Sequence, residues 1–193
     1  MSLMELERIG AKYRVDKLDH GYLSHYFARL EPRRFDPLII LEIGTYEGNS
    51  VKMWRDYFPF ATICGIDSYQ ECMVENEDRI TTFLGSQNDR DFLTKVANQI
   101  GPLDFVLDDA SHNGAYQIVS WEILWKSVKS GCWYVIEDAC TLFNLQWTGA
   151  NDRTMLDVIY EKRKDILCGN SDIREVDYIV DGPNNAMIWL RKR

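Results

Sequence analysis

The sequence predicts an α/β fold built around a mostly parallel sheet. Short apolar runs rich in β-branched and aromatic residues alternate along the chain with segments whose apolar residues have helical spacing. Because a helix between two strands carries the chain back to the edge where the first strand began, this alternation predicts crossover connections and parallel strands. Near the carboxyl end, two strand-like runs flank the turn 181–185, which predicts a closing antiparallel hairpin.

Each predicted element rests on a local pattern. The predicted strands are residues 38–43, 62–66, 80–84, 103–107, 132–136, 175–180 and 186–190. The predicted helices are residues 49–57, 89–100, 114–128 and 152–167, preceded by a helical segment over 10–30. Asp89 and Asn113 are predicted helix caps, because their side chains can accept hydrogen bonds from the free amides of a first helical turn.

The composition favours a folded protein that acts on small molecules. The chain of 193 residues carries 22 Lys and Arg against 30 Asp and Glu, a formal net charge of −8. This acidic balance argues against nucleic acid and against anionic membranes as partners. No apolar stretch approaches the roughly 20 residues of a membrane helix, and the first residues lack a signal-peptide core, so a cytoplasmic location is expected.

A glycine-bearing turn follows the first predicted strand. Gly44 and Gly48 would let the backbone approach a ligand at a helix N-terminus, although their spacing also suits an ordinary tight turn and departs from the dinucleotide pattern Gly-x-Gly-x-x-Gly. Asp67 ends the next strand 23 residues after Gly44, near the ~20 expected of a carboxylate that binds a ribose diol. Ser86 and Gln87 follow the third strand and could face an adenine edge or simply form a polar loop.

Acidic residues follow the fourth and fifth predicted strands. Asp108 and Asp109 end one of them, and Glu137 and Asp138 end the other. The carboxyl ends of parallel strands meet at one edge of a sheet, so these carboxylates would repel one another unless a hard divalent cation such as Mg²⁺ lay between them. His112 stands three residues after Asp109 and could act as a general base. The alternatives are solvent-exposed or helix-capping acids and a hydrogen-bonding loop histidine.

Together these stretches resemble a known family. The matching residues are Asp16-Lys17, His20-Gly21-Tyr22, Tyr26, Leu41-Glu42-Ile43-Gly44, 53–59, 65–67, 108–112 and 135–138. In them the chain resembles the S-adenosylmethionine-dependent, metal-dependent sugar O-methyltransferases of macrolide tailoring, the mycinamicin and macrocin type. The resemblance implies a class I methyltransferase fold: a Rossmann-like, seven-stranded, mostly parallel sheet with an antiparallel C-terminal hairpin and helices on both faces. It also implies one methyltransferase domain over 1–193, with an N-terminal helical arm and linker over 1–37 and the Rossmann-like core over 38–193.

The resemblance also implies roles for individual residues. Asp109, Glu137 and Asp138 would bind Mg²⁺ or a similar divalent cation, and His112 would remove the proton from the acceptor hydroxyl. S-adenosyl-L-methionine would be the cofactor. Its expected contacts are Glu42, Gly44, Gly48, Asp67, Ser86, Gln87 and Asp108.

The function expected from the sequence is O-methylation of a small-molecule hydroxyl, such as that of a sugar or natural-product glycoside, by a homo-oligomer. A nicotinamide-dependent oxidoreductase would also use a glycine turn and Asp67, but it explains neither the missing third glycine nor the acids. A non-catalytic relative that binds the cofactor or a protein partner is a second alternative. A hydroxylase of the cephalosporin-hydroxylase type is a third, although the two-histidine ligand set of ferrous oxygenases is missing.

Overall fold

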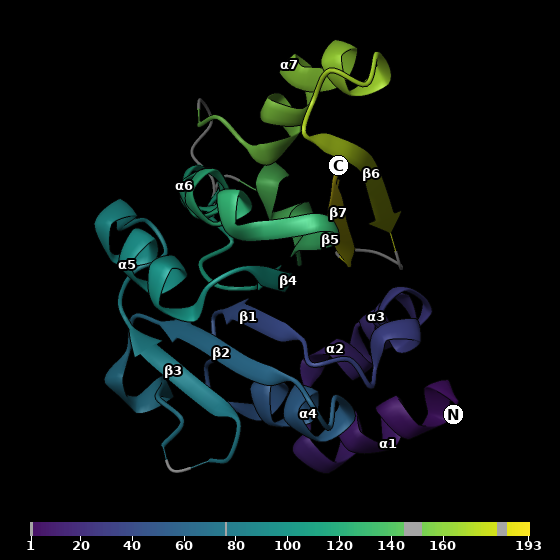
Figure 1. Ribbon diagram of the computed structural model, residues 1–193, viewed down its shortest axis with the longest axis vertical. Coiled ribbons are helices and arrows are strands. Elements are labelled where there is room, and N and C mark those ends of the chain that lie inside the picture. Colours follow the sequence, from purple (N-terminus) through teal and green to yellow (C-terminus); the bar gives the residue numbers. More distant parts are fainter. Residues whose placement is uncertain (1, 76, 145–151, 181–184) are drawn as a thin grey trace.

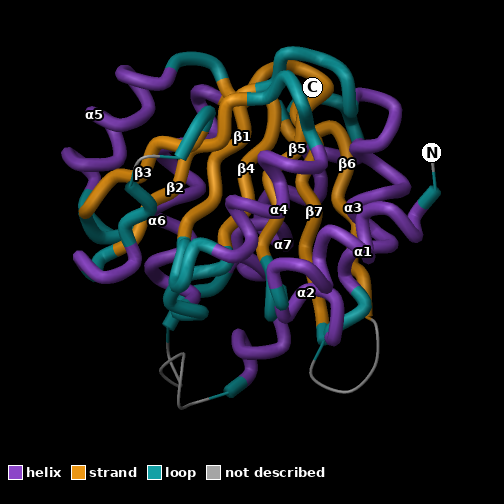
Figure 2. The backbone as a smooth tube through the Cα atoms, turned by 90° about the horizontal axis from the view of Figure 1, so that it is seen from below, coloured by secondary structure: helices purple, strands orange, loops and turns teal. Residues whose placement is uncertain are grey.

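A seven-stranded sheet runs through the molecule. In the computed structural model, which describes residues 2–75, 77–144, 152–180 and 185–193, the strand order is β3-β2-β1-β4-β5-β7-β6, and Figure 2 shows the strands side by side. The strands are β1 (Ile39–Ile43), β2 (Thr62–Asp67), β3 (Ile80–Leu84), β4 (Leu103–Asp108), β5 (Val128–Ile136), β6 (Ile173–Val180) and β7 (Ala186–Lys192). Strands β1 to β5 pair in parallel, and β7 is antiparallel to both β5 and β6. The predicted mostly parallel sheet with a C-terminal hairpin is therefore confirmed, while the hairpin turn 181–184 lies outside the described residues.

Helices cover both faces of the sheet (Figure 1). They are α1 (Leu3–Tyr13), α2 (Asp16–Asp19), α3 (Tyr22–Leu30), α4 (Asn49–Tyr57), α5 (Arg90–Ile100), α6 (Gly114–Leu124) and α7 (Met155–Leu167). Successive strand residues point to opposite faces, so Ile40 and Phe105 pack with Trp54 of α4, whereas Leu41 and Val106 belong to the core beneath α5, α6 and α7. Among the helices that the structure describes, none has the length and apolar composition needed to cross a membrane.

The predicted boundaries differ from the observed ones where chain reversals interrupt a periodic pattern. The helical segment predicted over 10–30 is three helices, because Arg14 (φ 56°) and Gly21 (φ 76°) adopt left-handed conformations at the breaks. Helix α6 ends at Leu124, and a 3₁₀ turn over 125–127 leads into β5. Strand β5 thus begins at Val128, four residues before the predicted start of that strand. Val128 at the start of β5 is buried, but Lys129 and Ser130 after it are polar and exposed, so this stretch lacks the apolar run that marks a buried strand.

The two predicted helix caps are confirmed. The Asp89 side chain accepts hydrogen bonds from the amides of Asp91 and Phe92 at the start of α5. The Asn113 side chain likewise accepts from Ala115 and Tyr116 at the start of α6. Both caps satisfy amides that the first helical turn leaves without a partner inside the helix.

A buried carboxylate stabilises the amino end of β4. One oxygen of Asp104, Oδ1, accepts a hydrogen bond from Arg33 at 2.8 Å, and Oδ2 accepts from Lys129 at 2.7 Å and from the Ile39 amide at 3.0 Å. Burial by itself raises the pKa of Asp104, but these hydrogen bonds outweigh it and hold the pKa below its ordinary value. The ionised carboxylate of Asp104 in β4 therefore connects the linker, through Arg33, with the start of β1 and with β5.

We expect Asp104→Asn to lower the free energy of unfolding by about 1.5–3 kcal/mol at pH 7, the range for hydrogen bonds to a charged group. Because the folded-state pKa of Asp104 is lowered, its contribution is fully present above the unfolded-state pKa of ~3.9 and is lost as the pH falls through the folded-state pKa. Urea unfolding of wild type and variant at pH 7 and in acid measures this. Asp36→Asn, which removes an exposed partner of the same Arg33, is the control. If Asp104→Asn lowers the free energy of unfolding by the same amount at pH 7 and in acid, the prediction is wrong.

Candidate functional site

A pocket of about 640 Å³ opens at the carboxyl ends of the parallel strands. Loops after β1, β2, β3, β4 and β5 form its wall together with residues 14–17 of the N-terminal arm. Its volume lies within the range of about 300–1,000 Å³ that is usual for small-molecule and cofactor sites. Of the residues expected at the site, those in the wall are Gly44, Asp67, Ser86, Gln87, Asp109, His112 and Asp138.

Gly44 brings two loops of the pocket into direct contact. Its φ is +93°, and a Cβ built on it would lie 2.2 Å from the carbonyl oxygen of Asp109. Only glycine therefore fits where the loop after β1 packs on the backbone after β4. Gly48 (φ +75°) turns the chain into α4 and faces Val74. Its expected contact with the cofactor stays a prediction.

Asp67 organises the glycine loop from the end of β2. Its Oδ2 accepts hydrogen bonds from the amides of Thr45 and Tyr46, both at 3.0 Å, and its Oδ1 accepts from the Tyr69 amide at 3.1 Å. The carboxylate thus holds the loop after β1 in place while it lines the pocket. The expected ribose contact of Asp67 stays a prediction.

Two other residues expected to contact the cofactor belong to a buried network. Asp108 is fully buried: its Oδ1 accepts from Gln87 at 2.5 Å, and its Oδ2 accepts from Ser120 at 2.6 Å and Tyr134 at 2.9 Å. Burial raises the pKa of Asp108 to about 6. The Gln87 carbonyl accepts from the Ser111 hydroxyl at 2.7 Å, so both ends of this amide bind protein. The Asp108 carboxylate therefore ties β4 to α6, and its expected contact with the cofactor stays a prediction.

The residues that follow β3 form a polar loop. Ser86 lines the pocket, and its hydroxyl donates to the side chain of Asn88 at 2.7 Å. Its expected place on the adenine side of the pocket remains a prediction.

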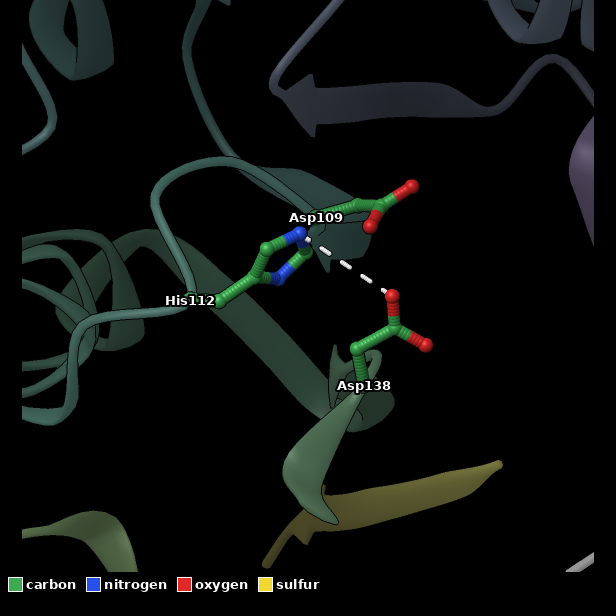
Figure 3. Close-up of side chains that lie close together, drawn as sticks. All are labelled: Asp109, His112 and Asp138. Atoms are coloured by element: carbon green, nitrogen blue, oxygen red, sulfur yellow. Dashed lines mark ion pairs between the residues drawn. The ribbon is translucent and has the colours of Figure 1, made fainter. Parts of the chain in front are cut away.

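Asp109, His112 and Asp138 converge on one point of the pocket wall. Each offers a ligand atom, and these atoms all lie within 4.8 Å of one another. Figure 3 shows the three side chains facing a common space, with His112 Nε2 3.9 Å from Asp138 Oδ2. His112 (φ 54°) and Asp138 (φ 50°) both have positive φ, a strained backbone that proteins retain mainly at functional positions.

Backbone hydrogen bonds hold these loops together. The Asp109 amide donates to the Ile43 carbonyl at 2.9 Å, and the Glu137 amide donates to the Asp108 carbonyl at 3.0 Å. The acids that follow β4 and β5 are therefore fixed at one edge of the sheet, as the sequence predicts.

Glu137 lies beside Asp109, and the two carboxylates share the ammonium of Lys17. The Glu137 carboxylate is buried, lies 3.1 Å from the ammonium of Lys17 and accepts a short hydrogen bond from the Tyr26 hydroxyl. Burial raises its pKa well above the ordinary value. The structure thus joins Asp109 and Asp138 with His112, while the third expected cation ligand binds Lys17 and Tyr26.

Lys17 is the cation at the centre of the buried acids. Its Nζ lies 2.5 Å from Asp109 Oδ2 and 3.4 Å from Glu42 Oε1, in addition to its contact with Glu137. Burial lowers the pKa of Lys17, but the three carboxylates outweigh burial and raise it well above the ordinary value. Lys17 therefore stays charged.

Glu42 lies beneath the pocket and not in its wall. The side chain is fully buried, and burial raises its pKa to about 7 against the opposing effect of Lys17. The expected place of Glu42 beside the methionine part of the cofactor stays a prediction. Its position under Lys17 makes it part of the support of the site.

The sequence did not assign roles to Lys17, Tyr22 or Tyr26. The Tyr22 hydroxyl donates to Asp138 Oδ1 at 2.8 Å, and Tyr26 and Lys17 bind Glu137. All three belong to the stretches that resemble the family, which was the available signal, but no local pattern showed that the arm reaches the strand ends.

Known proteins that are similar to this chain include O-methyltransferases. No family model matches the chain. The chain is 40% identical over 158 residues to 8-demethyl-8-(2-methoxy-alpha-L-rhamnosyl)-tetracenomycin-C 3'-O-methyltransferase of Streptomyces olivaceus, an alignment that covers 76% of this chain and 40% of that protein. It is 34% identical over 154 residues to mycinamicin VI 2''-O-methyltransferase of Micromonospora griseorubida, with 75% and 38% covered. The chain thus spans about two fifths of the length of these relatives.

A solved structure shares the fold. MycE methyltransferase from the mycinamycin biosynthetic pathway, in complex with Mg and SAH, matches with a TM-score of 0.85 and 29% sequence identity over 97% of this chain and 54% of that chain. The chain is therefore a homologue of the sugar O-methyltransferases of macrolide and polyketide tailoring and has their Rossmann-like methyltransferase fold.

Proposed function

We propose that this chain transfers a methyl group from S-adenosyl-L-methionine to a hydroxyl of a sugar-containing small molecule, with the help of a divalent cation such as Mg²⁺. The observation that carries the proposal is the convergence of Asp109, His112 and Asp138 on the pocket that Gly44 and Asp67 also line. The presence of Mg and SAH in the MycE complex supports the choice of cation and cofactor. The rhamnosyl and mycinamicin compounds in the names of the relatives support a glycosylated acceptor.

The residues present fit a hard divalent cation. Asp109 and Asp138 offer carboxylate oxygens, the ligands that Mg²⁺ prefers, and these oxygens lie within 4.8 Å of each other and of a His112 nitrogen. We propose Asp109 and Asp138 as ligands. We keep Glu137 as the third, since it follows β5 directly and shares the Lys17 ammonium with Asp109.

The residues of the chain then divide the work of methyl transfer. A bound divalent cation supplies Lewis-acid chemistry that lowers the pKa of an acceptor hydroxyl, and the sulfonium cofactor supplies the methyl group. His112 accepts the hydroxyl proton at Nε2, and Asp138 Oδ2, 3.9 Å away, stabilises the resulting imidazolium. As the new C–O bond forms, the C–S bond of the cofactor breaks. Gly44 and Asp67 orient the cofactor, because a close and aligned approach lowers the barrier.

Calorimetric titration with S-adenosylhomocysteine tests this assignment. We expect saturable binding to the wild type and about tenfold to hundredfold weaker binding to Asp67→Ala, since a lost hydrogen bond to a charged group is worth about 1.5–3 kcal/mol. Glu71→Ala changes an exposed acid in the turn after Asp67 and should leave the affinity within about twofold.

The same titration separates the alternatives. Binding of NADH instead of S-adenosylhomocysteine would support the oxidoreductase, and no binding of either would exclude a methyltransferase. Equal weakening by Glu71→Ala would assign the Asp67 effect to general damage of the turn.

A further inference from the structure

The N-terminal arm forms one side of the acid cluster. Helices α2 and α3 place the Lys17 ammonium on Asp109, the Tyr22 hydroxyl on Asp138 and the Tyr26 hydroxyl on Glu137. Within the described residues, every acid that we propose as a cation ligand thus contacts a side chain of the arm. The cation site and the arm are consequently one structural unit.

Tyr22 binds one carboxylate oxygen of Asp138, and the other oxygen faces the space that Asp138 shares with Asp109 and His112. Its hydroxyl lies 2.8 Å from Asp138 Oδ1, whereas Oδ2 lies 3.9 Å from His112 Nε2. A carboxylate is planar, so fixing one oxygen restricts the direction of the second. The Asp138 side chain is about one quarter exposed, and without such a partner water would compete for both oxygens.

The ring of Tyr22 is itself fixed by packing. It is fully buried in the core that contains α1, α3 and α4, and it makes an edge contact with His20 at 5.4 Å between ring centroids. Its hydroxyl also lies 3.4 Å from the Ala186 carbonyl of β7, a longer contact than that with Asp138. The rigid ring therefore directs the hydroxyl to Asp138.

We propose that Tyr22 is a positioning residue of the cation site: it orients Asp138 for the cation and thereby links cation affinity to docking of the N-terminal arm. The inference rests on the proposed function for the existence of the cation site. Partners that orient metal ligands typically change metal affinity by about 10–100-fold when they are removed. Because linkage is reciprocal, a bound cation in turn stabilises the docked arm.

Electron paramagnetic resonance titration with Mn²⁺, a Mg²⁺ substitute, tests the first half of the inference. We expect Tyr22→Phe, which keeps the buried ring and removes only the hydroxyl, to bind Mn²⁺ about tenfold more weakly than wild type. The matched control is Tyr13→Phe in the same arm. The Tyr13 hydroxyl donates to Asp56 at 2.7 Å, and Asp56 is not one of the proposed cation ligands. Tyr13→Phe should keep the wild-type affinity within about twofold.

Hydrogen–deuterium exchange tests the second half. Mn²⁺ should slow amide exchange over residues 16–30 in the wild type and in Tyr13→Phe, and this slowing should be lost in Tyr22→Phe at the same Mn²⁺ concentration. Unchanged Mn²⁺ affinity in Tyr22→Phe, or equal weakening in Tyr13→Phe, would overturn the inference alone. Absence of Mn²⁺ binding to the wild type would instead overturn the proposed cation site, and the inference with it.

Discussion

Replacement of Lys17 by Met is expected to lower the free energy of unfolding by about 3–5 kcal/mol at pH 7, the range for removing one partner of a buried ion pair. Lys17 is 1% exposed, and its Nζ lies 2.5 Å from Asp109, 3.1 Å from Glu137 and 3.4 Å from Glu42. Methionine fills a similar volume but leaves three neighbouring carboxylates without their shared positive charge. Charge repulsion and uncompensated burial, rather than a cavity, would then destabilise the fold.

Urea unfolding followed by circular dichroism in the presence of a chelator measures this loss. Lys12→Met is the matched control, because Lys12 pairs with Asp56 at 2.7 Å but its side chain is 60% exposed. Water and salt screen an exposed pair of this kind, so Lys12→Met should be close to wild type in stability. A Lys17→Met variant as stable as Lys12→Met would show that the buried acids are neutral in the folded protein and that Lys17 is not their counter-charge.

Replacement of His112 by Ala is expected to lower kcat by about 10²–10⁴-fold, the usual contribution of a positioned general base. The affinity for S-adenosylhomocysteine should stay within about twofold of wild type. The glycine loop packs at Gly44 against the backbone of Asp109 and Ala110, and His112 takes no part in that contact. The measurement is the rate of S-adenosylhomocysteine release with a glycosylated acceptor that the wild type methylates, beside calorimetry of the same variant.

His25→Ala is the control for this substitution. His25 lies on α3, outside the residues that line the pocket, so both the rate and the affinity should be close to wild type. If His112→Ala loses cofactor affinity in parallel with turnover, the histidine supports the loop after β4 and does not act as the base.

Local sequence patterns were sufficient for most of the sheet. The strands β1, β2 and β4 are buried apolar runs bounded by turns, and helix α4 has the bounds that its periodicity predicts. Strand β3 has its predicted bounds but is only partly buried, because it lies at the edge of the sheet. A short window already contains an apolar run or a helical period, so these elements need no knowledge of distant residues. The first residues of β5 were missed because the buried Val128 is followed by the exposed polar pair Lys129 and Ser130, which breaks the apolar run.

The edge of the sheet that carries the site could also be predicted. Parallel strands place their carboxyl ends together, and Asp109, Glu137 and Asp138 follow such ends directly. The sequence therefore determined which acids gather and which histidine joins them. It could not distinguish a carboxylate that faces the pocket from one that is buried, as Asp108 and Glu42 are.

Only the tertiary structure decided how the acids are held. Lys17 and Asp109 are 92 residues apart in the chain, and Tyr22 and Asp138 are 116 residues apart. No periodicity or turn signal encodes such a contact, because it depends on how the arm docks across the finished sheet. The sequence by itself determined the sheet and the residues at its edge; packing of α2 and α3 against that edge decided which charge each carboxylate faces and which oxygens remain for a cation.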